Sequence, residues 1–298
     1  LSAFGIIGGV SQQEVSDMNW TLITPAGFTF SIWSVIYVLL LIAVIMSILR
    51  SDKELKKPFL NRFNGLFILS CILNIAWNIT FNMQMLVVSC IIIFLLLINL
   101  CVLTILTREN PHMNVIYPLS MGIYNGWVLI ATVVNIAATL VNQNWNGFGL
   151  SEPLWGILIT IVAVLIVIGV GLLIKNPILP IPISWAFVGI GFELMNKTDH
   201  SINMILAFIA AGVLLIFSGV LFSKYGFRRK MTEDERALYK NKGKKEVPVE
   251  EPIYEPSPET LEEEVLEHHT DDVNHTPKLD DQTEPLLDEL KKKDQENL

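Results

Sequence analysis

The sequence predicts an all-α, polytopic integral membrane protein, a bundle of hydrophobic helices followed by an acidic tail. Its 298 residues are 52% hydrophobic and their mean hydropathy is +0.50, which is more apolar than is usual for a soluble domain. The apolar residues also form long runs with few charges. A run of about 20 such residues can span a bilayer as a helix.

Seven segments are long enough to form spanning helices. They cover residues 25–49, 63–82, 84–107, 115–140, 153–174, 178–196 and 202–223. The segment at 178–196 is the weakest, because Pro180 and Pro182 lie near its start. Membrane helices tolerate such prolines where neighbouring groups satisfy the freed backbone. Residues 1–10 are apolar but too short to span, so we expect a truncated first helix and eight helices in total.

The first segment begins with TPAGFTFSIWSVIY at residues 24–37, which is unusually polar for a membrane anchor. We expect Thr24 to be the N-cap and Pro25 the first helical residue. Gly27 would allow a neighbouring backbone or a ligand to approach closely. This end of the helix is therefore predicted to meet something other than lipid.

Lys and Arg side chains predict how the helices are oriented. Eleven of them lie in the loops at one end and in the segment after residue 223, whereas the opposite loops contain only Lys197. The positive-inside rule places the basic end in the cytoplasm, and the tail with it. In a bacterium, the membrane would be the plasma (inner) membrane.

The charge divides the chain into a hydrophobic body and a tail. Residues 1–230 carry a net charge of +4 and residues 231–298 a net charge of −12. We expect residues 225–298 to form a disordered cytoplasmic tail, in which short Leu/Glu stretches could dock on a protein partner. No nucleic-acid partner is expected.

The sequence lacks the residues that haem ligation, a disulfide framework, a metal site or the common catalytic motifs would require. No His lies within a span, so haem ligation by two histidines in the membrane is not expected. Cys71, Cys90 and Cys101 are spaced for neither a disulfide framework nor a metal site. Motifs for a zinc protease, a Ser–His pair or a phosphate-binding glycine loop are absent. We therefore predict no catalytic residue, no metal and no obligatory cofactor. Glu193, the one carboxylate within a span, is a candidate coupling acid, although an ion pair would explain it equally.

Carboxamides and aromatic rings form the most informative pattern. Asn74, Asn78 and Asn82 recur every four residues, which places them on one helix face, with Trp77 and Phe81 beside them. A second face carries Ser120, Tyr124, Trp127, Ala131 and Asn135, and Trp33 and Tyr37 are again four residues apart. Such residues can simply join helices or form an interfacial belt. Three helices that bring them to a similar depth would also suit a planar hydrophobic ligand.

At these residues the sequence resembles the tryptophan-rich sensory protein/translocator protein (TspO/MBR) family. The matching motifs are W-x-x-x-Y at Trp33 and Tyr37, L-N-x-A-W-x-x-x-F from Leu73 to Phe81, and Y-x-x-W-V-x-x-A-x-x-x-N from Tyr124 to Asn135. Phe30-Ser31 stands where the family usually has Gly-Pro. The resemblance covers about residues 1–145.

The resemblance implies a five-helix unit that binds porphyrins or other flat hydrophobic molecules beneath a cover formed by residues 11–24. Residues 1–145 would form this unit, residues 146–224 three additional transmembrane helices, and residues 225–298 the tail. Together with the residue pattern, it predicts a ligand site lined by Trp33, Tyr37, Asn74, Trp77, Asn78, Tyr124, Trp127, Ala131 and Asn135.

Three functions follow. The first is a sensor or carrier that binds a porphyrin or another tetrapyrrole without obligate turnover. The second is a secondary transporter for a small solute in which Glu193 couples transport to protons. The third is light-dependent porphyrin degradation, for which the resemblance implicates Trp33 and Trp127. The expected partners are the lipid bilayer and a hydrophobic small molecule, and a homodimer is left open.

Overall fold

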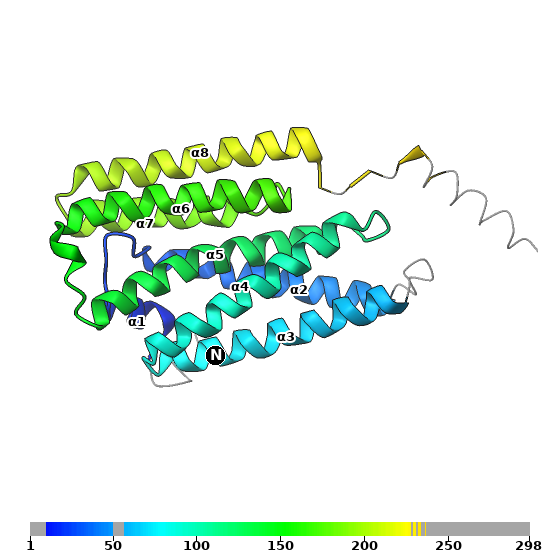
Figure 1. The fold of residues 1–298 in the computed structure, drawn as a ribbon, viewed down its shortest axis with the longest axis horizontal. Helices are drawn as coiled ribbons and strands as arrows, with labels where there is room; N and C mark the ends of the chain where they lie inside the picture. Colours follow the sequence, from blue (N-terminus) through cyan, green and yellow to red (C-terminus); the bar gives the residue numbers. More distant parts are fainter. Residues whose placement is uncertain (1–9, 50–56, 228, 231, 234–235, 237–298) are drawn as a thin grey trace, which may run out of the picture. The chain divides into compact units, whose positions relative to one another are not determined.

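The computed structural model describes residues 10–49, 57–227, 229–230, 232–233 and 236 (Figure 1). The described residues up to Thr232 belong to one compact unit. The predicted truncated first helix, except for Val10, and nearly all of the predicted tail lie outside the described residues. A division of the membrane part at residue 145 stays a prediction.

Every regular element in the described part of the chain is helical, as the sequence predicts. The elements are α1 (Gln12–Met18), η2 (Gly27–Ser31), α2 (Ile32–Leu49), α3 (Lys57–Asn82), α4 (Leu86–Glu109), α5 (Ile116–Asn142), η3 (Gly147–Gly149), α6 (Glu152–Ile174), α7 (Pro180–Lys197) and α8 (Ser201–Tyr225). All seven predicted segments thus correspond to helices. Six are long and apolar enough to cross a membrane, and α7, the segment with prolines and Glu193, is the exception among the long helices. The prediction of a polytopic helical membrane protein is confirmed.

Successive long helices run in opposite directions (Figure 1). The C-terminal ends of α2, α4, α6 and α8 therefore gather at one end of the bundle, with Arg108, Lys175 and Lys224 among the side chains there. Residues 11–24 and the α5–α6 connection lie at the other end. Which end faces the cytoplasm stays a prediction.

Helix α5 is the central helix of the unit. It packs against α2, α4 and α7, and most of its side chains are buried. Gly122 and Gly126 lie four residues apart on its face toward the start of α7. A Cβ on Gly122 would lie 2.7 Å from Asn176 Oδ1, and one on Gly126 would lie 2.6 Å from Pro182 Cγ and closer still to the Leu179 carbonyl oxygen. Small residues at this spacing allow two helices to approach closely.

The predicted helix start at Thr24 and Pro25 is wrong. The Thr24 hydroxyl accepts a hydrogen bond from the Thr21 backbone N–H (2.8 Å) within the loop, and η2 begins only at Gly27. The backbone here bonds to α7 instead of starting a helix, since the Ala26 N–H donates to the Gly189 carbonyl (3.2 Å). A Cβ on Gly27 would run into the Gln13 side chain, so the predicted close approach does occur, with α1 as the neighbour.

The segment predicted to be a covering loop contains the short helix α1. Its N-terminus has a capping box, in which the Glu14 N–H donates to Ser11 Oγ (3.2 Å) and the Ser11 N–H donates to Glu14 Oε2 (2.6 Å). These hydrogen bonds lower the pKa of the Glu14 carboxyl from its ordinary value of 4.5. Gln12 Nε2 also donates to Asn78 Oδ1 on α3, which fastens α1 to the bundle.

Candidate functional site

The aromatic residues that define the sequence motifs gather around Trp33. The centroid of its ring lies 5.8 Å from that of Trp77, 6.2 Å from that of Tyr124 and 6.3 Å from that of Trp127. All four side chains are buried, with 7% exposure or less. Helices α2, α3 and α5 thus contribute rings to one cluster, as the sequence pattern predicts.

A small apolar cavity of about 30 Å³ lies against this cluster. Five of the nine predicted ligand-site residues line it: Trp33, Trp77, Trp127, Ala131 and Asn135. The cavity has room for about one water molecule, far below the 300–1,000 Å³ typical of small-molecule pockets. A tetrapyrrole would fit only after the walls move apart.

Asn135 connects α5 to two neighbouring helices. Its Oδ1 accepts hydrogen bonds from Trp77 Nε1 (3.0 Å) on α3 and from Ser89 Oγ (3.1 Å) on α4. Its Nδ2 lies 3.0 Å from the same Ser89 hydroxyl and 3.5 Å from Thr139 Oγ1. This buried carboxamide therefore fixes the Trp77 ring in the cavity wall while it joins the helices.

The other four predicted ligand-site residues do not line the cavity. Tyr37 is 50% exposed on the outer face of α2, stacked on Trp33, and its hydroxyl lies 3.5 Å from Asn74 Oδ1. Asn78 bonds to Asn74 and to Gln12, so both carboxamides hold helices together. Tyr124 is buried behind Trp33.

Glu193 lies apart from the aromatic cluster, near the C-terminal end of α7. Its Oε1 is 2.6 Å from Lys197 Nζ, and the same ammonium lies 3.4 Å from Asp17 Oδ1 of α1. The hydrogen bond to Glu193 is the main reason that the pKa of Lys197 is raised above 10.5. The carboxylate therefore has a cationic partner, which is the alternative that the sequence left open.

Sequence reasoning did not place several other cavity residues in the site. Ser16 of α1, Phe30 of η2 and Ala186 of α7 line the cavity, and Phe30 packs edge-to-face on Trp127 with 6.1 Å between centroids. Phe81, noted only as the neighbour of Trp77, lines it as well. Ala186 lies outside the predicted five-helix unit, and its small apolar side chain carries no signal in the sequence.

Three of the lining residues carry buried polar atoms that have no hydrogen-bond partner among the described residues. These atoms are the Trp33 Nε1, the Trp127 Nε1 and the Ser16 Oγ. A buried polar atom left unpaired costs about 1–3 kcal/mol, and native structures contain few of them. These atoms are closed off from the cavity, whose surface is apolar, so a bound molecule would reach them only after the walls move apart.

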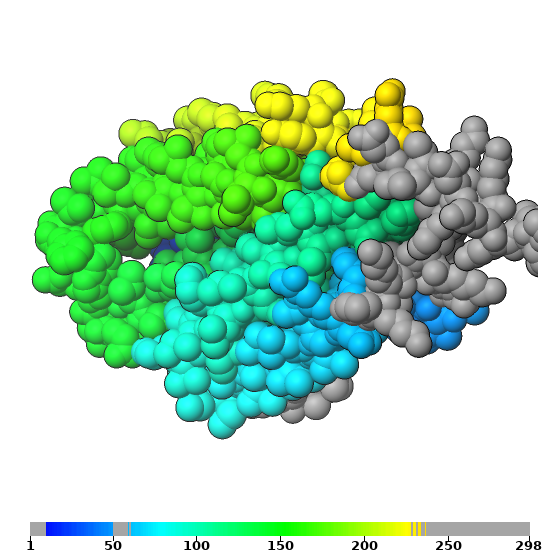
Figure 2. Space-filling view, turned by 45° about the vertical axis from the view of Figure 1, so that its right-hand side comes forward, coloured from blue at the N-terminus to red at the C-terminus, as the bar shows by residue number. Residues whose placement is uncertain are grey.

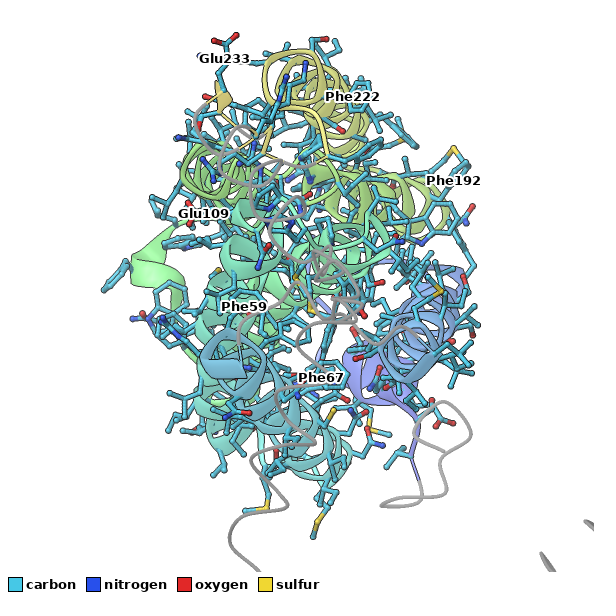
Figure 3. All side chains as sticks on the ribbon, turned by 90° about the vertical axis from the view of Figure 1, so that its right-hand side faces the viewer. Phe59, Phe67, Glu109, Phe192, Phe222 and Glu233 are labelled. Carbon is cyan, nitrogen blue, oxygen red and sulfur yellow. The ribbon has the colours of Figure 1, made fainter. Side chains whose placement is uncertain are left out.

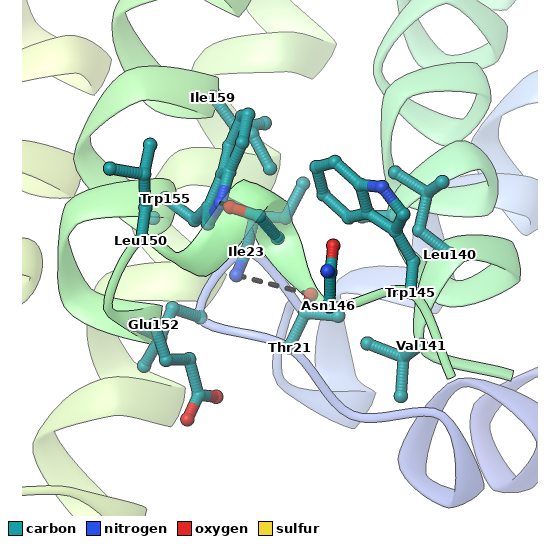
Figure 4. Close-up of a pocket in the computed structure, with 14 residues that line it drawn as sticks. Thr21, Ile23, Leu140, Val141, Trp145, Asn146, Leu150, Glu152, Trp155 and Ile159 are labelled. Carbon is teal, nitrogen blue, oxygen red and sulfur yellow. Dashed lines mark hydrogen bonds between the residues drawn. The ribbon is translucent and has the colours of Figure 1, made fainter. Parts of the chain in front are cut away.

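A larger pocket of about 260 Å³ lies between the loop before η2, the end of α5 and the start of α6 (Figure 4). The Trp145 and Trp155 rings lie on its wall with centroids 4.9 Å apart. In the space-filling view, an opening appears among the green residues of this region, with blue residues of the N-terminal segment visible through it (Figure 2). The same N-terminal segment thus borders both the pocket and the aromatic cavity.

The described residues contain no group of three or more His, Cys, Asp or Glu side chains placed to hold a metal ion.

A search of curated proteins and a search of solved structures found no match. A family model described as TSPO-like protein matches residues 1–220, which extends past residue 145 and includes α6, α7 and most of α8. With its aromatic motifs gathered in one helical bundle and most of its length matched, the chain belongs to the TSPO-like protein family.

Proposed function

We propose that this integral membrane protein binds a planar, largely hydrophobic ligand of the porphyrin class between α2, α3 and α5, as a sensor or carrier. One observation carries the proposal: three indole rings from three helices line a single apolar cavity, and two of these indoles have a buried N–H group without a hydrogen-bond partner among the described residues. Flat aromatic walls favour a flat ligand. The indole N–H groups of Trp33 and Trp127 would donate to its acceptor atoms, such as carboxylates.

Binding requires the cavity to widen, and α1 is the element placed to allow this. Four side-chain hydrogen bonds hold this segment to the bundle. They run from Gln12 to Asn78, from Lys197 to Asp17, from Gln84 to Met18 and from Asn142 Nδ2 to Asn19 Oδ1 (3.1 Å). Such bonds each contribute about 1 kcal/mol net, and Val15 of α1 is fully buried, so displacement of α1 costs several kcal/mol that ligand binding must offset. The neighbouring 260 Å³ pocket would receive the ligand on its way in.

The test is a titration of the purified protein with a tetrapyrrole, followed by quenching of tryptophan fluorescence. Trp127→Phe should weaken binding about tenfold, because it removes one donor and part of the ring surface. Trp155→Phe is the matched control: it also removes one of the seven tryptophans, but from the outer pocket. Weaker binding in the control with unchanged affinity in Trp127→Phe would move the site to the outer pocket and contradict the proposal.

The transporter hypothesis has less support. The contact between Glu193 and Lys197 gives the carboxylate a structural partner, and neither residue lines the aromatic cavity. Proton coupling through Glu193 and light-dependent porphyrin degradation both stay predictions.

A further inference from the structure

A third pocket lies at the opposite end of the bundle, where α4, α6 and α8 end. Its volume is about 500 Å³. Among the described residues, Glu109 is the one carboxylate that lines it, against five cationic side chains: Arg108, Lys175, Lys224, Arg229 and Lys230. Figure 3 views this end of the bundle, with the lining residues Glu109 and Phe222 labelled. We call it the basic pocket.

Three of these cations surround a single ring, that of Tyr225. The distances to the ring centroid are 5.4 Å for Arg108 Cζ, 5.4 Å for Lys224 Nζ and 5.6 Å for Lys175 Nζ. Cations near helix C-termini compensate the helix dipole, and the ring face attracts them. The helix-dipole and cation–π attractions each stabilise these cations only modestly at exposed sites. The three positive charges around one ring also repel one another. An anion among them would relieve this repulsion.

Arg108 gives the independent indication of a ligand. Its residue exposure is only 6%, and its Nε has no hydrogen-bond partner among the described residues. A guanidinium presents its donors in a fixed planar fork, and a buried donor without a partner is unfavourable. This side chain lines the basic pocket, so a small movement that uncovers its buried Nε would let an oxyanion bound there supply the missing acceptor.

We propose that the basic pocket binds a phosphate group, and that the phosphate belongs to the headgroup of an anionic phospholipid. Arg and Lys together are the usual protein groups for phosphate, and basic pockets between membrane helices bind acidic headgroups. The lining also includes Leu173 and Phe222, which are 73% and 48% exposed on the outer face of the bundle. These apolar side chains lie where the acyl chains of a bound lipid would continue. A free phosphate would use the cations but not this apolar rim.

The test uses the full-length protein in a mild detergent, with lipid binding measured by native mass spectrometry. Phosphatidic acid should bind more tightly than phosphatidylcholine, whose headgroup has no net charge, and added salt should weaken it. Lys175→Gln combined with Lys224→Gln should weaken phosphatidic acid binding at least about tenfold. Both side chains are exposed, so the fold should be retained.

Arg62→Gln is the matched control, because Arg62 is an exposed cation at the same end of the bundle but outside the pocket. It should leave binding unchanged. Equal binding of the two lipids, or equal effects of the double variant and the control, would overturn the proposal. Competition by inorganic phosphate at the same concentration as the lipid would keep the phosphate site but overturn the lipid as its source.

Discussion

The contact between α5 and the start of α7 supports a quantitative prediction. Gly126 lies where α7 comes closest to the central helix, and a Cβ added there would lie 2.6 Å from Pro182 Cγ and closer to the Leu179 carbonyl oxygen. Neither obstacle is the end of a flexible side chain. Gly126→Ala must therefore push α7 away from α5, beside Trp127 of the aromatic cavity.

The size of the effect follows from two opposing terms. Overpacking of a tight interior costs about 1–3 kcal/mol, and a backbone obstacle places Gly126→Ala at the upper end. Replacing a helical glycine by alanine stabilises the helix by about 0.5–1 kcal/mol, which offsets part of this cost. The net destabilisation should be about 2 kcal/mol, or a melting temperature about 4–8 °C lower for a unit of this size.

Thermal unfolding of the purified protein in detergent measures this change. Gly169→Ala on α6 is the control, because a Cβ there would meet no atom within 4 Å. It has only the favourable helix term and should raise the melting temperature by about 1–4 °C. If Gly126→Ala proves as stable as Gly169→Ala, the close approach of α7 to α5 is refuted.

Two further predictions concern the cover and the cavity wall. The lowered pKa of Glu14 means that its capping contribution is complete above about pH 4.5 and is lost as the pH falls through the folded-state pKa. Amide exchange in α1, corrected for the intrinsic rate, should therefore accelerate at acidic pH in the native chain but not in Glu14→Gln, and identical profiles would contradict the cap. Asn135→Leu should cost about 1–3 kcal/mol, because it leaves the Trp77 indole N–H without its acceptor. Adding Trp77→Phe should recover part of that loss in a double-mutant cycle, and strictly additive losses would show that the two side chains are not coupled.

The sequence predicted the helices well because hydrophobic length is a direct signal of a spanning helix. It also brought Trp33, Trp77 and Trp127 to one place, since helical spacing fixes which residues share a face. The position of Tyr37 could not be predicted by this reasoning. A spacing of four puts it beside Trp33, yet the helix turns it toward the outer face. Periodicity gives the relative directions of side chains but not which face meets a neighbour.

Contacts between segments that are far apart in the chain could not be predicted from the sequence. The start of α2 was mispredicted because the Ala26 N–H bonds to Gly189 on α7, and no local pattern announces a partner so far along the chain. Asn78, which the sequence predicts to line a ligand site, bonds to Gln12 of α1, and its role toward a ligand stays a prediction. A carboxamide on a buried face has the same appearance in the sequence whether it meets a ligand or another helix.

The attachment of η2 to α7 limits how far the protein can be shortened. Trp185 Nε1 donates to the Thr29 carbonyl (3.1 Å), and a Cβ on Gly189 would run into the Thr29 side chain. A chain ended at residue 145 would lose both contacts and would uncover the face of α5 at Gly126 that packs on the start of α7. Helix α7 therefore supports the wall of the aromatic cavity, and the smallest unit able to keep that wall in place extends at least to the end of α7.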